Sequence, residues 1–303
     1  MKILPPEIVS AIQKIVDAEK VAIIGFVAPQ DAVRVSPVSF ASAAIEEGDM
    51  YRLEEIVNEI KNQENPPDTL HFIIQTPGGE LYTSYKIAYF LRNSFKKIKA
   101  YVPYQAASGG TLFCCAANEV YLGDLGNLTP IDPQVRYNNT ILSAYAFERC
   151  VDTLQTIFGE KTPGEVPTPW QQMAEKIDPI LYDEMQTAVW NTLLYAKELL
   201  LKSNYSENVA QRIVARLARP QESHAHPILF EAARKIGLNV CENDDTIKIY
   251  SKYVSQRLKE KSTSHIIECF LPLIKKDDES KPTANNSIRS EEKPIRGEGQ
   301  ENI

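Results

Sequence analysis

The stretch that decides the fold is residues 104–111, YQAASGGT, read together with TPGG at residues 76–79. Each segment follows an apolar, strand-like run and precedes a run with helical spacing. Both segments therefore place small residues at a strand-to-helix turn, where backbone N–H groups point outward and can hold negative charge. The second turn adds the hydroxyl of Ser108, which could act as a nucleophile. The two turns together predict a serine acyl-transfer site with an oxyanion hole.

The pattern around these turns alternates between strands and helices. Strands are predicted at residues 21–27, 70–75, 98–102 and 119–122, and helices at residues 6–20, 48–62, 80–93 and 109–117, with Asp49 as a candidate cap. The resulting β–α–β–α–β order over residues 21–122 predicts an α/β fold, with a mostly parallel sheet covered by helices. In such sheets the functional loops lie past the carboxyl ends of the strands, where both turns fall.

Beyond this region the pattern becomes mainly helical. Helices are predicted at residues 144–158, 170–202 (as one helix or two), 206–217 and 227–237, with Gly237 as C-cap, and residues 246–258 fit a helix or a strand. Residues from about 275 to 303 are rich in charged and polar side chains, which predicts disorder. We therefore expect a core at residues 1–142, a mainly helical extension at 143–274 that completes the domain, and a disordered tail at 275–303.

Composition excludes several classes of protein. The chain has 303 residues, a net charge of −7 and a pI near 5.3, which argues against a general nucleic-acid or anionic-membrane binder. Its N-terminus lacks the apolar core of a signal peptide, and no apolar run approaches the roughly 20 residues of a membrane helix. The five cysteines form no CxxC pattern, which favours a reducing, cytoplasmic setting. No metal-ligand spacing or phosphate loop is visible, so we expect no cofactor.

Two longer segments carry a resemblance to a known family. Residues 71–135 contain TPGG, ASGGT, AANEV and LTPIDPQ in that order, and residues 223–238 contain SHAHPI followed by AARKIGL. Over roughly residues 20–240 the chain resembles the serine dehydrogenase proteinase family, a branch of the Clp-protease/crotonase superfamily that also includes signal peptide peptidases. The resemblance implies a spiral ββα core, a homo-oligomer and a serine peptidase acting on peptides or proteins. Carried over by position, Ser108 would be the nucleophile, and the N–H groups of Gly79 and Gly109 would form the oxyanion hole.

A serine hydroxyl needs a partner that takes its proton, and the sequence leaves that partner open. His224 occupies the histidine position of the family, and Asp132 could orient a histidine as the third member of a triad. Lys161 is an alternative base, because it follows Ser108 at a distance that suits a Ser–Lys dyad. A catalytic lysine must be desolvated, however, and Lys161 lies in a polar, Pro/Gly-rich break. Of the other histidines, His71 lies in a predicted strand and His265 lies beyond the resemblance.

Each of these residues also has a plain structural interpretation. Ser108 could simply cap the helix that follows it, His224 could cap a turn, and Asp132 with Pro133 could start a turn. The chain also departs from the family at Gln75, where a histidine often precedes TPGG. This departure puts activity in question.

The main functional hypothesis is a serine hydrolase, most specifically a peptidase that works through an acyl-enzyme. One alternative is a crotonase-type acyl-CoA enzyme, in which the two N–H donors stabilise an enolate and Lys96, Lys97 and Lys99 are the nearest basic residues in sequence. Another alternative is a catalytically weak, oligomeric scaffold subunit.

Overall fold

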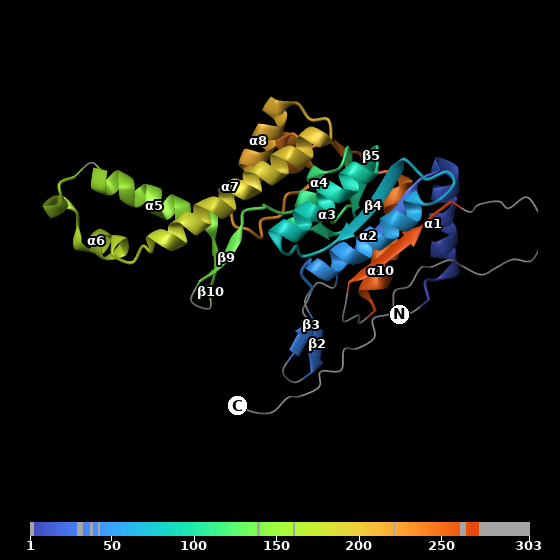
Figure 1. Cartoon of the computed structure of the whole chain (residues 1–303), viewed down its shortest axis with the longest axis horizontal. Coiled ribbons are helices and arrows are strands. Elements are labelled where there is room, and N and C mark those ends of the chain that lie inside the picture. The colour runs from blue at the N-terminus through green and yellow to red at the C-terminus, as the bar shows by residue number, and fades with distance from the viewer. Residues whose placement is uncertain are drawn as a thin grey trace, which may run out of the picture.

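The computed structural model describes residues 3–28, 33–36, 39–41, 43–137, 140–159, 161–220, 222–260 and 265–272. The predicted tail at residues 275–303 lies outside the described residues. The chain forms a body centred on a sheet, and a helical arm projects from one side of that body (Figure 1).

The helices and strands follow one another in an order close to the predicted one. The elements of the first half are α1 (Pro6–Glu19), β1 (Ala22–Val27), β2 (Val33–Ser36), β3 (Ser39–Ala41), α2 (Glu47–Lys61), β4 (Thr69–Gln75), α3 (Leu81–Ser94), β5 (Lys97–Val102), β6 (Gln105–Ala106), α4 (Gly109–Cys115), β7 (Glu119–Leu122), β8 (Asn127–Leu128), β9 (Gln134–Tyr137) and β10 (Thr140–Ser143). The second half contains α5 (Ala144–Gly159), a 3-10 turn η1 (Pro163–Glu165), α6 (Thr168–Ala174), α7 (Pro179–Lys202), α8 (Glu207–Ala218), α9 (Phe230–Ile236), β11 (Val240–Cys241), α10 (Asp245–Leu258) and β12 (Ile266–Phe270).

The main sheet has six strands in the order β11-β7-β5-β4-β1-β12. All neighbouring strands are parallel except β12, which runs antiparallel to β1. The predicted α/β class with a mostly parallel sheet is therefore confirmed. No helix in the described part of the chain is long and apolar enough to cross a membrane.

Both faces of the sheet are covered, which explains why its central strands are apolar throughout. Successive side chains of a strand point to opposite faces. Ile23, Ile73 and Tyr101 thus pack with α1 and α10, while Ile24 and Phe72 pack against the helices of the other face. Figure 1 shows α2 and α3 lying across the sheet on that second face. The two cores hold the strand ends, and therefore the two Gly-rich turns, in fixed positions.

A second set of short strand pairings lies beyond the carboxyl ends of the main strands. Thr76, just after β4, bridges Ala106 in β6, and β6 pairs in parallel with β8, which follows β7. β4 and β5 are thus each followed by a short strand or bridge and then a helix, which is a ββα repeat. The repeat agrees with the spiral core that the resemblance implies. It also lays the segment after β4 beside the segment after β5.

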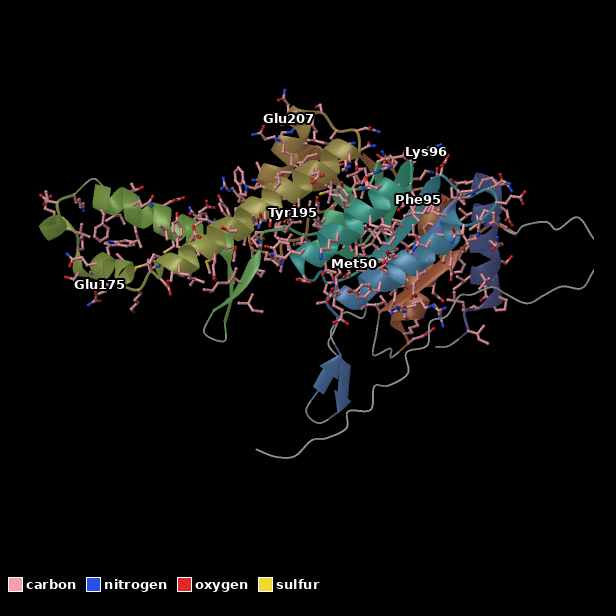
Figure 2. The ribbon with its side chains drawn as sticks, viewed as in Figure 1. Met50, Phe95, Lys96, Glu175, Tyr195 and Glu207 are labelled. Atoms are coloured by element: carbon pink, nitrogen blue, oxygen red, sulfur yellow. The ribbon has the colours of Figure 1, made fainter. Side chains whose placement is uncertain are left out.

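The arm comprises the β9–β10 hairpin, α5, η1, α6 and the first part of α7 (Figure 1). Its own small core consists of Ala144, Leu181, Met185 and Val189. α7 then continues into the body, where Tyr195, labelled in Figure 2, stacks on Tyr85 of α3 with ring centroids 4.1 Å apart. α7 is thus shared by the arm and the body.

The structure decides one open alternative and differs from the predicted elements in several places. Residues 245–258 are a helix, and β11 and β12 join the main sheet from within the segment expected to be mainly helical. α9 begins only at Phe230, because the backbone of Ile228 pairs with Leu128 instead. Asp49 does not occupy the cap position itself: Glu46 is the N-cap of α2, and the Asp49 carboxylate accepts its N–H at 3.0 Å in a capping box.

Candidate active site

The two Gly-rich turns lie against each other. The Thr76 N–H donates to the Gln105 carbonyl at 3.0 Å, and the Ala107 N–H donates to the Thr76 carbonyl at 3.0 Å. Gly78 has a φ of +100°, and a Cβ added there would lie only 2.8 Å from the Ser108 Cβ. Gly78 is therefore required both for its backbone conformation and for this close approach.

Ser108 has a strained backbone, with φ 46° and ψ −108°, immediately before α4. A non-glycine residue at positive φ is costly and persists only where its surroundings hold it. The Ser108 N–H donates to the Thr129 Oγ1 at 2.9 Å, which helps to hold the turn. The Ser108 side chain makes no capping hydrogen bond with α4. The alternative interpretation, in which the Ser108 side chain only caps α4, is therefore not supported by a hydrogen bond.

The two N–H groups expected to form the oxyanion hole belong to Gly79 and Gly109. The bridge between Gly79 and Ile45 uses the Gly78 carbonyl and the Glu80 N–H, at 2.8 and 3.1 Å. In a parallel pairing of this kind, the N–H of Gly79 itself points to the opposite side. Gly109 is the first residue of α4, where an N–H has no partner within the helix.

Asp132 and His224 form a pair. The His224 Nδ1 lies 2.8 Å from the Asp132 Oδ1, and the Asp132 side chain is 1% exposed. The Asp132 Oδ2 accepts hydrogen bonds from the Ser143 Oγ at 2.6 Å and the Gln134 Nε2 at 3.1 Å. The His224 side chain is 29% exposed, and its Nε2 is the ring nitrogen that Asp132 leaves free to act on another group.

One cavity of about 440 Å³ brings these groups together. Ser108, Gly79, Gly109 and His224 all line it. The rest of the wall is largely apolar and comes from both the body and the arm: Pro77, Glu80, Leu81, Tyr82, Leu112, Ile131, Pro133, Gln134, Val135 and Ala188. These four residues therefore line one space that is large enough for part of a peptide.

Other residues singled out in the sequence lie elsewhere. Lys161 is exposed, in the turn between α5 and η1, and this turn forms the far end of the arm (Figure 1). Glu175, labelled in Figure 2 at the end of α6, lies toward the same end. Gln75 is fully buried, and its Oε1 accepts the Gln105 N–H at 3.1 Å. Gln75 thus links the segments of the two turns through a buried hydrogen bond.

The remaining histidines do not line the cavity. His71 is buried, with its Nδ1 2.9 Å from the Tyr250 hydroxyl. Burial lowers the pKa of His71 to about 3, and the charges of Lys99 and Lys97 act in the same direction. His265 is also buried, with its Nδ1 2.6 Å from the Asp49 Oδ2. These two histidines are therefore buried and bound to side chains outside the cavity, while His226 is exposed.

The described residues contain no group of three or more His, Cys, Asp or Glu side chains that could hold a metal ion. The adjacent thiols of Cys114 and Cys115 are buried in the core. Burial raises the pKa of both thiols, that of Cys115 to about 12, so neither supplies a thiolate near neutral pH.

Two residues of the site were not identified from the sequence. Thr129 belongs to the LTPIDPQ segment, but nothing in the pattern connects its hydroxyl to the backbone of Ser108. Ser143 marks only the start of the helical region in the sequence, and its contact with Asp132 depends on a hairpin that was not predicted. A hydroxyl residue before a helix is a capping signal, which was the one hint available for Ser143.

A family model matches nearly half of the chain. Residues 8–154 match the model of the family described as ClpP-like SDH-type serine proteinase. Two proteins of Methanocaldococcus jannaschii are similar: the uncharacterized protein MJ0137, 28% identical over 67% of this chain, and the uncharacterized protein MJ1495, 29% identical over 63%. The alignments span 66% and 58% of those relatives, less than two thirds of either.

Solved structures give weaker likenesses. A mutant of the 1510-N membrane-bound stomatin-specific protease has a TM-score of 0.43 at 13% identity, covering 68% of this chain and 79% of that one. A second mutant of the same protease, in complex with a substrate peptide, has a TM-score of 0.42 at 14% identity, covering 68% and 74%.

The family match includes both Gly-rich turns and Asp132, while His224 lies beyond it. The order of the motifs, the ββα repeat and the match agree with one another. Residues 8–154, just under half of the chain, thus match the ClpP-like SDH-type serine proteinase family.

Proposed function

We propose that the chain is a serine peptidase that cleaves peptide bonds through an acyl-enzyme, with Ser108 as nucleophile, His224 as general base and Asp132 as the residue that orients His224. One observation carries this proposal. Ser108 and the Asp132-bound His224 line a single cavity together with Gly79 and Gly109. This combination supplies the four parts that acyl transfer needs: a nucleophile, a base, a group that orients the base, and an oxyanion hole.

The reaction follows from these roles. The Ser108 Oγ attacks the carbonyl carbon of the scissile bond, and its proton passes to the His224 Nε2. The C–N bond then breaks, and His224 gives the proton to the departing amine. Water attacks the acyl-enzyme in the second half, with His224 again taking a proton, and the Ser108 hydroxyl is restored. The Asp132 carboxylate stabilises the imidazolium that forms in each half.

The negative charge on the substrate oxygen would be held by the N–H groups of Gly79 and Gly109. Such preorganised donors are worth roughly 10²–10³ in kcat each in serine proteases. The neighbouring N–H of Ser108 is already committed to Thr129. Gly109 is therefore the donor that we assign on the helix side.

Three observations favour this arrangement over the alternatives. Lys161 is exposed at the far end of the arm, and it lacks the desolvation that a lysine base requires. The lysines considered for an acyl-CoA site are engaged in ion pairs, Lys96 with Asp68, Lys97 with Glu119 and Lys99 with Glu19. The segment of Lys96 to Lys99 also begins β5, at the end of the strand opposite to the cavity.

The homo-oligomer implied by the resemblance is also part of the proposal. The arm and the middle of α7 expose several large apolar side chains, which an assembly of several copies would cover: Ile141, Met173, Ile180, Trp190 and Leu194. Sedimentation of the purified chain would measure the number of subunits.

A peptide library of varied sequence tests the proposed activity without knowledge of the natural substrate. The purified protein and the Ser108→Ala variant are each incubated with the library, and new termini are identified by mass spectrometry. We expect new termini with the wild-type protein alone. Equal cleavage by both proteins would contradict the role of Ser108, and no cleavage by either would favour the scaffold alternative.

A further inference from the structure

Asp132 is tied to the start of the arm as well as to His224. Its Oδ1 faces the His224 Nδ1, while its Oδ2 accepts a hydrogen bond of 2.6 Å from the Ser143 hydroxyl. Ser143 is the last residue of β10 and directly precedes α5. A second tie runs through the backbone, because the Ala144 N–H donates to the Pro133 carbonyl at 2.9 Å.

The Ser143 hydroxyl both donates and accepts a hydrogen bond. Its single proton goes to Asp132, and its oxygen accepts the Ala146 N–H at 3.2 Å, which caps the first turn of α5. One hydroxyl thus joins the buried carboxylate to the helix that begins the arm. The other donor to the Asp132 Oδ2, Gln134, makes a longer bond of 3.1 Å from an exposed residue.

The torsion that turns a carboxylate about its last bond is soft and broad. A carboxylate that orients a histidine must therefore be held by its other contacts. Ser143 supplies the shortest of the hydrogen bonds on the Oδ2 side. Ser143 itself does not line the cavity and so is not expected to touch a substrate.

We propose that Ser143 is a positioning residue: its hydroxyl holds the Asp132 carboxylate in the orientation that serves His224, and it links this orientation to the base of the arm. This inference rests on the proposed peptidase function. It assigns a role to a residue outside the recognised motifs. If Ser143 holds Asp132 in this way, the first turn of α5 contributes indirectly to the activation of Ser108.

The test uses the rate at which a fluorophosphonate probe labels the full-length protein, because labelling of a serine depends on its activation. The variants are Ser143→Ala, which removes the hydroxyl, and Ser143→Thr, which keeps it. Thr153→Ala is the matched control, since Thr153 is an exposed hydroxyl residue on the same helix that donates only to the Arg149 carbonyl. Both the rate constant and the final extent of labelling are measured by intact mass.

We expect Ser143→Ala to label roughly tenfold more slowly than wild type, the order of the loss of one charge-assisted hydrogen bond. Its final extent should match wild type, since a purely structural defect would lower the extent instead. Ser143→Thr should recover most of the rate, and Thr153→Ala should equal wild type. A rate for Ser143→Ala within twofold of wild type, or a lowered extent with an unchanged rate, would overturn the inference. A wild-type protein that takes no label at Ser108 would instead contradict the proposed function.

Discussion

The Nδ1 of His224 lies 2.8 Å from the Oδ1 of Asp132, although 92 residues separate them in the sequence. The contact forms because β8, just before Asp132, pairs with Ile228, just after His224. Hydrogen bonds between Leu128 and Ile228 run in both directions, at 3.1 and 2.8 Å. A two-residue bridge between distant segments thus brings the second and third members of the proposed triad together.

Asp132→Asn tests what this contact does. The amide fits the same space but carries no charge to stabilise an imidazolium, and it can favour the wrong histidine tautomer. We expect the rate of peptide cleavage to fall by roughly 10²–10⁴-fold, with the fold retained by circular dichroism. Asp183→Asn, at an exposed position on α7, serves as the control. A loss below threefold would mean that Asp132 is only a structural partner of His224.

Thr129→Val tests the support beneath the nucleophile. Valine has nearly the same shape but cannot accept the hydrogen bond of the Ser108 N–H, and it cannot donate to the Pro130 carbonyl as the Thr129 hydroxyl does. Because Thr129 is buried, we expect the free energy of unfolding to fall by about 1–3 kcal/mol. The labelling rate should fall with it, since the turn holding Ser108 loosens. Urea unfolding measures the first effect, and unchanged stability would contradict the contact.

Ser108→Gly and Ser108→Ala separate backbone strain from chemistry. Both variants lack the hydroxyl, so both should be inactive. Only glycine adopts a φ of 46° with a ψ of −108° without cost. We therefore expect the glycine variant to be more stable than the alanine variant by about 1 kcal/mol or more. Equal melting temperatures for the two variants would show that the turn is not strained.

His71 predicts a specific loss of stability in acid. The folded protein holds the pKa of His71 at about 3, mainly through burial, against a usual value of 6.5. The carboxylate of Glu19, 3.4 Å from the His71 Nε2, opposes this lowering of the pKa. Glu19 also pairs with Lys99, and the effect of burial on His71 is larger than that of Glu19. Between pH 6.5 and 3 the unfolded chain binds the proton and the folded chain does not. Stability should therefore fall as the pH falls, by at most about 1.4 kcal/mol per pH unit from this group.

The variant His71→Asn removes this titration. Its overall stability should be lower, because the contact with Tyr250 changes. The slope of its unfolding free energy between pH 4 and 6.5 should nevertheless be shallower than that of wild type. Equal slopes in a urea series over this pH range would contradict the low pKa.

The sequence was most informative where local chemistry decides the structure. TPGG and ASGGT predicted strand-to-helix turns. Glycine and other small residues are typical of positions where two backbone segments approach closely and where a helix begins. The positions of β4, β5, α3 and α4 followed from the same periodicity. Gly237 was predicted as a helix C-cap, and its φ of 115° confirms it.

The sequence was least informative where long-range pairing decides the structure. β12 lies far from β1 in the sequence but pairs with it in the sheet. The five residues of β12 do not indicate by themselves which strand they will pair with. The β9–β10 hairpin, which brings Ser143 to Asp132, was not predicted, although Asn138 and Asn139 between its strands are of a turn-forming type. The general base stayed open among His224, Asp132 and Lys161 for the same reason. Only the folded chain places His224 at the cavity and Lys161 at the far end of the arm.

The most direct test of the central claim is the site of covalent labelling by a fluorophosphonate. The wild-type protein is treated with the probe, digested and mapped by tandem mass spectrometry, with Ser108→Ala treated in parallel. The account predicts one adduct per chain, on Ser108, and no adduct on the variant. An adduct on another residue, equal labelling of both proteins, or no adduct on folded wild-type protein would contradict it.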